Sequence, residues 1–486
     1  MRSAVKSLLL GGLLGKLLGV AREFVFAALF GTGELAAAYR VAQTATLAPV
    51  NLFASDTLAS GFLPLHTTLK TSDPALARGL YRATTITVAA LTLIVATLLI
   101  VCRAQWVSLL GPGLNSSTRH MAESILVAIS IGLPFYVGTA MASYVQMSYH
   151  VYRLASLRAT VQSVGLIVGT VLAFALDWPA LLGFGFSSAY IALWVISMPS
   201  MKRLTAGAPT PSRSTMRAGL GMFWRNSRAV VLLPVILQIG LVIERATATR
   251  LGTTATSALD YARTLTDTAV VLVAAPVSFA VLSQLAGLSR DAIWARARHL
   301  LRLGIVCSVP LAVFGMLHAK EITELLFARG AFTQESVQVT QVILVSLLAG
   351  LPAQLVAYVL LRVLNAQMRN ATTLWLTVGS VCAGTAALLM TWSHVGPASL
   401  GIGSAVTGVV QLLGCCWALR LSSTLLVSLG VTLLPSLAIV AINQAPLGVP
   451  TLWAIEVLVL SMFAGTVKEI RREVENAMLA IARRRP

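Results

Sequence analysis

The sequence predicts an all-α integral membrane protein with about 14 transmembrane helices. First, 57% of its 486 residues are hydrophobic, only 11% are charged, and the mean hydropathy is +0.83. Second, apolar runs of about 20 residues recur along the whole chain, which is the length that a membrane helix needs. The predicted spans are 8–30, 36–63, 80–101, 122–147, 156–176, 180–200, 229–249, 260–287, 300–318, 338–361, 371–392, 399–419, 422–442 and 450–467.

Basic residues are distributed unevenly between the connections. With the N-terminus in the cytoplasm, 26 of the 36 Lys and Arg residues fall in the termini and even-numbered connections, and five fall in the odd-numbered ones. This asymmetry is the positive-inside pattern, and it predicts a multi-pass membrane protein with both termini cytoplasmic. The basic residues behind the net charge of +19 therefore orient the helices in the membrane and contact anionic membrane lipids. This account of the charge excludes nucleic acid as a partner.

The chain divides at its longest polar connection and shows an internal repeat. "LLGPGLNSS" begins at Leu109 and "LLFARGAFT" at Leu325, and a Gly-Leu-Pro triplet follows each, inside a predicted span. Six helices separate the triplets, so both run in the same membrane direction, as in a parallel duplication. Pro134 and Pro352 of these triplets are predicted hinges, since a proline inside a membrane helix is tolerated where it lines a cavity. The predicted parts are an N-terminal lobe (1–200), a cytoplasmic linker (201–228), a C-terminal lobe (229–420), two further helices (421–467) and a basic cytoplasmic tail (468–486).

Charged side chains interrupt the first two helices of each half. Each charge at bilayer depth costs about 2.5–3.5 kcal/mol on the insertion scale, so these positions indicate a function. One interpretation is a set of buried ion pairs that only hold helices together. The other, which we favour, is a water-filled cavity with mostly cationic walls that suits an anionic, phosphate-bearing substrate. The candidate site residues are Lys16, Arg22, Glu23, Arg40, Asn51, Asp56, Arg245, Asp260, Arg263 and Asp267.

Motifs for catalysis and for cofactor binding are missing. The stretch "GGLLGKL" has the wrong glycine spacing for a phosphate-binding loop, and the five cysteines and six histidines show no metal-ligand spacing. His66 and His150 lie near cytoplasmic helix ends, where we expect them to be solvated. The sequence therefore predicts a transporter that is not an enzyme and that carries no cofactor and no metal.

Several stretches resemble the MurJ/MviN family. They are "GKLLGVAREFVFAALFGTGELAAAYRVA", "FLPL", "SALDYARTL", "LSR" and "ELLFARGAFTQESVQVTQVILVSLLAGLPAQLVAYVLLRVLNAQ". The family comprises lipid flippases of the multidrug/oligosaccharidyl-lipid/polysaccharide exporter superfamily. The resemblance implies two six-helix lobes in a V around a central cavity plus two C-terminal helices. It also implies a polyprenyl-diphosphate-linked saccharide, a lipid II-like cell-wall precursor, as the substrate of an alternating-access flippase.

The charged positions of the family are only partly retained. The basic residues of the first helix resemble Lys16 and Arg22, whereas an acidic position of the second helix is Ala37 and an Arg-Arg pair is Val50–Asn51. The basic position of the eighth helix falls at Thr264, next to Arg263, and the polar motif after the tenth helix is altered at 369–373. These departures keep two alternatives open: a flippase for an exopolysaccharide or O-antigen lipid-linked oligosaccharide, and an ion-coupled drug antiporter of the same superfamily. Enzymes of envelope polysaccharide synthesis are the corresponding protein partners.

Overall fold

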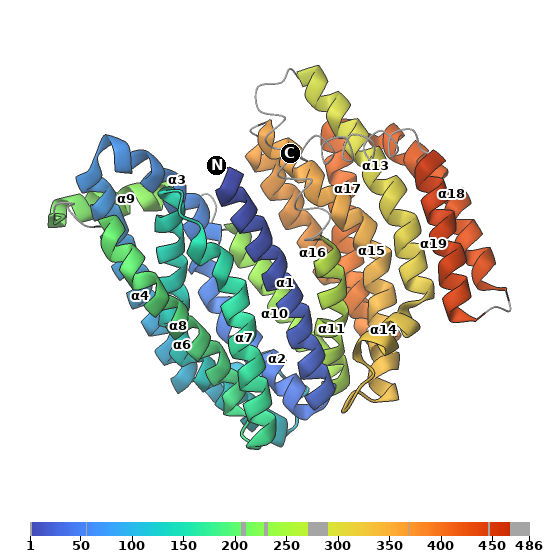
Figure 1. Cartoon of the computed structure of the whole chain (residues 1–486), viewed down its shortest axis with the longest axis horizontal. Helices are drawn as coiled ribbons and strands as arrows, with labels where there is room; N and C mark the ends of the chain where they lie inside the picture. The colour runs from blue at the N-terminus through green and yellow to red at the C-terminus, as the bar shows by residue number, and fades with distance from the viewer. Residues whose placement is uncertain are drawn as a thin grey trace. The chain divides into compact units, whose positions relative to one another are not determined.

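The computed structural model describes residues 2–54, 56–205, 210–227, 232–270, 290–367, 369–445 and 448–466. Within these ranges the regular secondary structure is helical, with no strand (Figure 1). Ten of the described helices are long and apolar enough to cross a membrane. The predicted all-α membrane fold is thus confirmed, while the described residues do not establish the exact number of 14 spans.

The chain forms two compact units. The first unit holds residues 1–261 together with 327–336, and the second holds 262–326 and 337–486. The division falls within α11, between Tyr261 and Ala262. The lobe and linker boundaries drawn from the sequence stay a prediction.

The helices that lie wholly in the first unit precede α11 in the chain. They are α1 (Arg2–Phe30), α2 (Glu34–Ala54), α3 (Asp56–Ser72), α4 (Pro74–Val101), α5 (Arg103–Leu110), α6 (Ser116–Ser148), α7 (Arg153–Ala175), α8 (Ala180–Thr205), α9 (Arg213–Ser227) and α10 (Leu232–Arg250). Helix α1 packs against α7, α2 against α6 and α10, and α8 against α6 and α7.

The remaining helices follow. They are α11 (Thr253–Ala269), α13 (Arg290–Leu317), α14 (Ala319–Phe327), α15 (Gln334–Ala366), α16 (Asn370–Val395), α17 (Ala398–Leu419), α18 (Ser422–Asn443) and α19 (Val449–Thr466). In the second unit α16 packs against α17, α13 against α18, and α19 against both α18 and α13.

The predicted spans match these helices with a few differences. The span 36–63 is described as two helices, α2 and α3, on either side of residue 55. Of the span 260–287, residues 271–287 lie outside the described part, as does the tail 468–486. The short helices α5 and α14 were not predicted, because their eight and nine residues are too short for a span.

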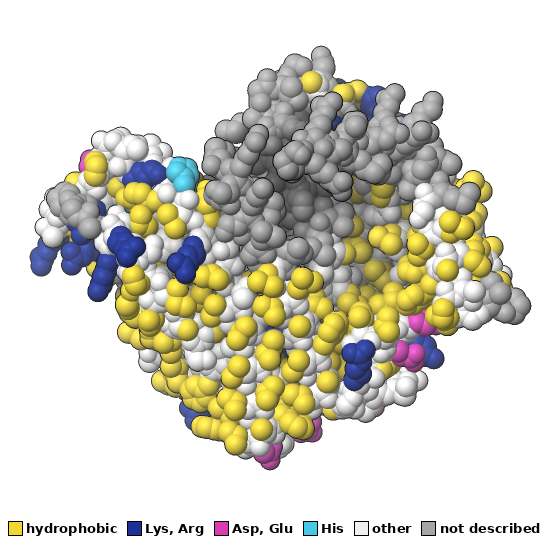
Figure 2. Space-filling model, in the orientation of Figure 1, with side chains coloured by type: hydrophobic (Ala, Val, Ile, Leu, Met, Phe, Trp, Pro, Cys, Tyr) yellow, Lys and Arg dark blue, Asp and Glu magenta, His cyan; other side chains and the backbone are white. Residues whose placement is uncertain are grey.

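The polar connection 201–228 contains a helix that the sequence analysis did not predict. Helix α9 packs on α4 and α3. Its Gly219 meets the backbone of Leu80, and its Phe223 is buried. Its opposite face exposes Trp224 and several arginines, so α9 is an amphipathic helix within the predicted linker. Figure 2 shows Lys and Arg side chains gathered near α9 and the adjoining end of α4, beside a surface of mainly hydrophobic side chains.

The two Gly-Leu-Pro triplets occupy equivalent helix contacts. A Cβ atom on Gly132 of α6 would lie 2.6 Å from the Cα atom of Ser187 in α8. A Cβ atom on Gly350 of α15 would lie 2.3 Å from the Cα atom of Ala405 in α17. Each triplet therefore provides the close approach of its helix to the second helix after it, which supports the internal duplication.

His66 differs from the sequence expectation. Its side chain is buried, at 3% exposure, although its position near a helix end predicted solvation. The ring stacks on Phe62, with ring centroids 5.1 Å apart, and its Nδ1 atom lies 2.9 Å from the hydroxyl of Ser148 in α6. The contact of α3 with α6 thus removes His66 from water, and no local sequence pattern shows such a contact. His150 is exposed, as expected.

Candidate functional site

Glu23 of α1 lies at the centre of a charged network in the first unit. Its carboxylate is almost fully buried, with 3% of the side chain exposed. The Oε1 atom accepts hydrogen bonds from Nε and Nη2 of Arg22 at 3.2 and 2.6 Å. Arg40 of α2 donates to both oxygens of Glu23, through Nη1 at 3.4 Å and through Nη2. One buried carboxylate therefore holds two guanidinium groups from two helices.

Arg40 is enclosed by aromatic rings and by a second carboxylate. Its guanidinium carbon lies 4.9 Å from the ring centroid of Phe26 and 5.4 Å from that of Tyr261. Its Nε atom is 3.7 Å from an oxygen of Asp260, which is an ion-pair distance, but this buried N–H makes no hydrogen bond. Because 5% of the side chain is exposed, Arg40 has no direct path to a large ligand.

Arg245 of α10 completes the network through Asp260 of α11. Two nitrogens of Arg245 donate to the two carboxylate oxygens at 2.7 and 3.0 Å, which is the bidentate geometry of a strong Arg–carboxylate pair. Its Nη1 atom also donates to the carbonyl of Thr256, and its Nε atom donates to the hydroxyl of Thr44 in α2 at 3.1 Å. Arg245 therefore ties α2, α10 and α11 together.

Among the ion pairs that the structure describes in this network, positive groups outnumber negative ones. Three guanidinium groups (Arg22, Arg40 and Arg245) face two carboxylates (Glu23 and Asp260). Arg22 is the most exposed of the three, with 23% of its side chain open. The interpretation as helix-holding ion pairs thus describes Arg40 and Arg245 well, whereas Arg22 combines a fixed position with access to a ligand.

A second polar cluster of the first unit was missed by the sequence analysis. Arg158 of α7 lies over the ring of Tyr136, 5.0 Å from its centroid, and its Nε atom donates to the hydroxyl of Tyr190 at 3.4 Å. Tyr190 donates to Gln162, and Tyr136 donates to Asn51 at 2.9 Å. Arg158 lies near the start of the predicted span 156–176, where a basic residue is ordinary and does not by itself indicate a site. Its spacing of four residues from Gln162 on one helix face was the available signal.

The segment 327–336, which contains the sequence "RGAFT", packs on the turn between α1 and α2 within the first unit. The backbone N–H of Ala331 donates to the carbonyl of Ala28 at 2.8 Å, and the hydroxyls of Thr32 and Ser336 lie 2.7 Å apart. Gly330 has a φ of +60°, and a Cβ atom there would lie 2.1 Å from the carbonyl oxygen of Ala28. Only glycine fits this position, because both the backbone conformation and the contact exclude a side chain.

The other predicted site residues are distributed over several helices. Lys16 is half-buried on α1. Asn51 belongs to the cluster of Tyr136. Asp56 is the first residue of α3, and its side chain lies outside the described part. Arg263 and Asp267 belong to α11 in the second unit, the first half-buried and the second exposed. Pro134 and Pro352 lie inside α6 and α15, and their role as hinges stays a prediction.

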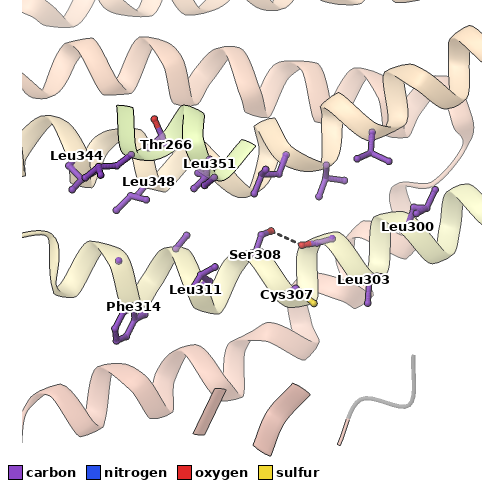
Figure 3. Close-up of a pocket in the computed structure, with 18 of the residues that line it drawn as sticks. Thr266, Leu300, Leu303, Cys307, Ser308, Leu311, Phe314, Leu344, Leu348 and Leu351 are labelled. Atoms are coloured by element: carbon purple, nitrogen blue, oxygen red, sulfur yellow. Dashed lines mark hydrogen bonds between the residues drawn. The ribbon is translucent and has the colours of Figure 1, made fainter. Parts of the chain in front are cut away.

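The second unit contains an apolar cavity of about 450 Å³ (Figure 3). Its walls come from α11, α13, α14 and α15, and leucines such as Leu303, Leu311, Leu344 and Leu348 dominate them. Ser308, which also lines it, donates its hydroxyl to the carbonyl of Gly304 at 2.6 Å and so offers no free donor. The cavity suits a hydrocarbon chain rather than a sugar or a phosphate.

Comparison with known sequences decides the family. The sequence model described as "Lipid II flippase MurJ" matches residues 26–468, which is most of the chain. The chain belongs to the MurJ lipid II flippase family. A probable lipid II flippase MurJ from Thermotoga maritima is 23% identical over 347 residues, which cover 70% of this chain and 69% of that protein.

Solved structures agree with the MurJ assignment. A lipid II flippase MurJ in an inward closed conformation superposes with a TM-score of 0.82 at 17% identity, covering 94% of this chain and 97% of that one. An inward-facing multidrug resistance transporter of the MATE family and the MOP superfamily gives a TM-score of 0.62 at 15% identity, covering 84% and 95%. These likenesses show the fold. With the family match, they make this chain a multi-pass membrane transporter of the flippase class and confirm the resemblance that the sequence predicted.

Proposed function

We propose that this protein translocates a polyprenyl-diphosphate-linked saccharide across the bacterial inner membrane by alternating access, with both termini in the cytoplasm. The charged network around Glu23 carries the proposal. A diphosphate brings negative charge, and a buried network with excess guanidinium groups lowers the cost of bringing that charge into the protein.

Arg22 is the residue of the network that we assign to the diphosphate. Glu23 holds its guanidinium from one side, and a quarter of the side chain remains open. Lys16 on the same helix is a half-buried cation that we assign to the same substrate group. Arg263, a half-buried cation of the second unit, is a separate candidate for binding the substrate. The apolar cavity of the second unit fits the polyprenyl chain, because its leucine-rich wall has the polarity of a hydrocarbon tail.

Transport of labelled lipid II in proteoliposomes tests this assignment. Replacement of Arg22, Lys16 or Arg263 by Gln should lower the rate of translocation and leave the amount of folded protein unchanged. Arg217→Gln is the matched control, since Arg217 is an exposed arginine of α9, a helix that packs on α4 and α3. Normal translocation by all three single variants would refute the assignment.

A flippase for a different lipid-linked oligosaccharide, such as an exopolysaccharide or O-antigen precursor, is the second candidate. Two buried apolar side chains favour it. Ala37 and Val50 are both 0% exposed, and the resemblance implies charged residues at these positions. Loss of charge at these two positions, while Arg22 keeps a partly open cation, suits the same diphosphate with another glycan.

Replacement of the lipid II flippase in a host separates the two candidates. Full rescue of growth by this chain would show that it accepts lipid II. Failure to rescue, combined with loss of a surface polysaccharide after deletion of its own gene, would support the second candidate. A drug antiporter is the weakest alternative, because a cationic drug requires acidic walls and the described network has an excess of arginine.

A further inference from the structure

A buried histidine–glutamate pair joins two helices of the second unit. His318 lies between α13 and α14, and Glu456 lies in the middle of α19. The Nε2 atom of His318 and the Oε2 atom of Glu456 are 2.5 Å apart. The two side chains are 3% and 0% exposed, so this short contact is sealed from water.

The pair is incompletely satisfied. The second oxygen of Glu456, Oε1, is buried without a hydrogen-bond partner. The indole Nε1 atom of Trp453 is also buried without a partner, and Trp453 stands three residues before Glu456, on the same face of α19. The ring of Trp453 meets that of His318 edge-on at 5.6 Å. A carboxylate with one free oxygen in such a site is costly when it is charged and far less costly when it holds a proton.

A third titratable group connects the pair with the surface. The Oε2 atom of Glu321 in α14 is buried without a hydrogen bond and lies 4.0 Å from Nδ1 of His318, the ring nitrogen that faces away from Glu456. The Glu321 side chain as a whole is 33% exposed. Its neighbours Lys320, which is exposed, and Glu324, which is half-buried, pair with each other at 3.9 Å, so this edge of α14 is open to water.

We propose that Glu321, His318 and Glu456 form a proton-binding site, in which a proton from the aqueous side comes to rest on Glu456. The protonated carboxyl of Glu321 gives its proton to Nδ1 of His318, and the proton on Nε2 moves to Oε2 of Glu456. The N–H bond at Nε2 breaks as the O–H bond at Glu456 forms, so the imidazole ends neutral with its proton on Nδ1. Nothing is oxidised or reduced, and one proton has moved from water to the interior.

The bound proton controls how α19 is held. Among the described residues of α19, Glu456 is the sole charged side chain, and α18, which also packs on α19, has none. The titratable and charged groups of α13 and α14 near the pair are His318, Lys320, Glu321 and Glu324. A protonated Glu456 lets α19 stay against α13. Loss of the proton leaves a buried charge and loosens the helix.

Infrared difference spectroscopy of the purified full-length protein between acid and alkaline pH tests the site directly. We expect a carboxylic acid C=O band that titrates in the wild type, disappears in Glu456→Gln and persists in Glu324→Gln. Glu324 is the matched control because it lies on α14 but pairs with Lys320 rather than with His318. A difference spectrum in which folded Glu456→Gln retains every band of the wild type would overturn the proposal.

Hydrogen exchange of the α19 peptides tests the consequence. After correction for the intrinsic rate, exchange in α19 should rise with pH in the wild type and in Glu324→Gln, and stay flat in Glu456→Gln. Equal pH dependence in all three proteins would contradict the link between proton and helix. If Glu456→Gln does not fold, the infrared measurement is made on His318→Gln instead. Its carboxyl band should remain but exchange with D₂O more slowly than in the wild type, and an unchanged rate would refute the relay.

Discussion

Glu23 and Arg40 form a buried ion pair that joins α1 to α2, and both carboxylate oxygens of Glu23 take part in it. The pair matters for stability because neither group can reach water if its partner is lost. Arg40 would keep the ion-pair contact to Asp260 at 3.7 Å and its contacts to the rings of Phe26 and Tyr261, but no close carboxylate. The charges of the first helix therefore have two tasks: to hold α2 in place and to position Arg22.

Replacement of Glu23 by Gln should destabilise the protein strongly. Removal of one partner from a buried ion pair costs about 3–5 kcal/mol, because the other charge remains buried. We expect a clear fall in the thermal unfolding midpoint of the purified protein. Glu335→Gln, at an exposed position of α15, is the control and should change the midpoint little. Equal midpoints for the two variants would show that Glu23 is not the centre of the network.

Replacement of Arg245 by Lys tests the geometry of the network rather than its charge. Arg245 makes two hydrogen bonds to Asp260 and further ones to Thr256 and Thr44. An ammonium group cannot reproduce this planar arrangement, so the variant should lose stability although its charge is kept. The measurement is the unfolding midpoint, with Arg217→Lys on the exposed face of α9 as control. A midpoint like that of the wild type would mean that charge alone suffices.

The membrane fold could be predicted from the sequence because length and hydropathy decide which segments cross a bilayer. Spans such as 399–419 and 422–442 lie within α17 and α18 almost residue for residue. Helix α9 was missed because its mixed composition resembles that of a linker, and its amphipathic pattern gains meaning only when it packs on α4.

The candidate site was predicted only in part, because local sequence patterns do not show contacts between helices. Intramembrane charge identified Glu23, Arg40, Arg245 and Asp260, which the structure brings together. The sequence could not show which charges neutralise each other, since that depends on contacts between helices. For the same reason no local pattern shows a role for Glu456, because its partner His318 is 138 residues away in the sequence.

The Gly-Leu-Pro repeat can be tested with a pair of glycine substitutions. Gly350→Ala would place a Cβ atom against the backbone of Ala405, and overpacking of this kind costs about 1–3 kcal/mol. Gly379→Ala on α16 is the control, because a Cβ atom there meets nothing within 4 Å. A helical Gly-to-Ala change in open space stabilises by up to about 1 kcal/mol, so the two variants should shift the unfolding midpoint in opposite directions. Shifts of the same sign would argue against the close contact of α15 with α17.

The buried His66 makes stability depend on pH. Burial, with the nearby charge of Lys70, lowers the pKa of His66 from 6.5 to about 4. The hydroxyl of Ser148 donates to the carbonyl of Val145 and so accepts the proton on Nδ1 of His66, which leaves the neutral ring satisfied. The unfolded chain binds a proton at this histidine below pH 6.5, whereas the folded protein does so only near pH 4. The stabilisation is therefore complete above pH 6.5 and is lost as the pH falls towards 4, by roughly 3 kcal/mol.

Chemical unfolding at a series of pH values checks this contribution. The free energy of unfolding of the wild type should fall more steeply between pH 6.5 and 4 than that of His66→Asn, which has no ring to titrate. His150→Asn removes an exposed histidine and should keep the slope of the wild type, because a solvated ring has no reason to titrate differently in the folded and unfolded states. If the wild type and His66→Asn showed the same slope across this range, the buried ring would not be the source of the pH dependence.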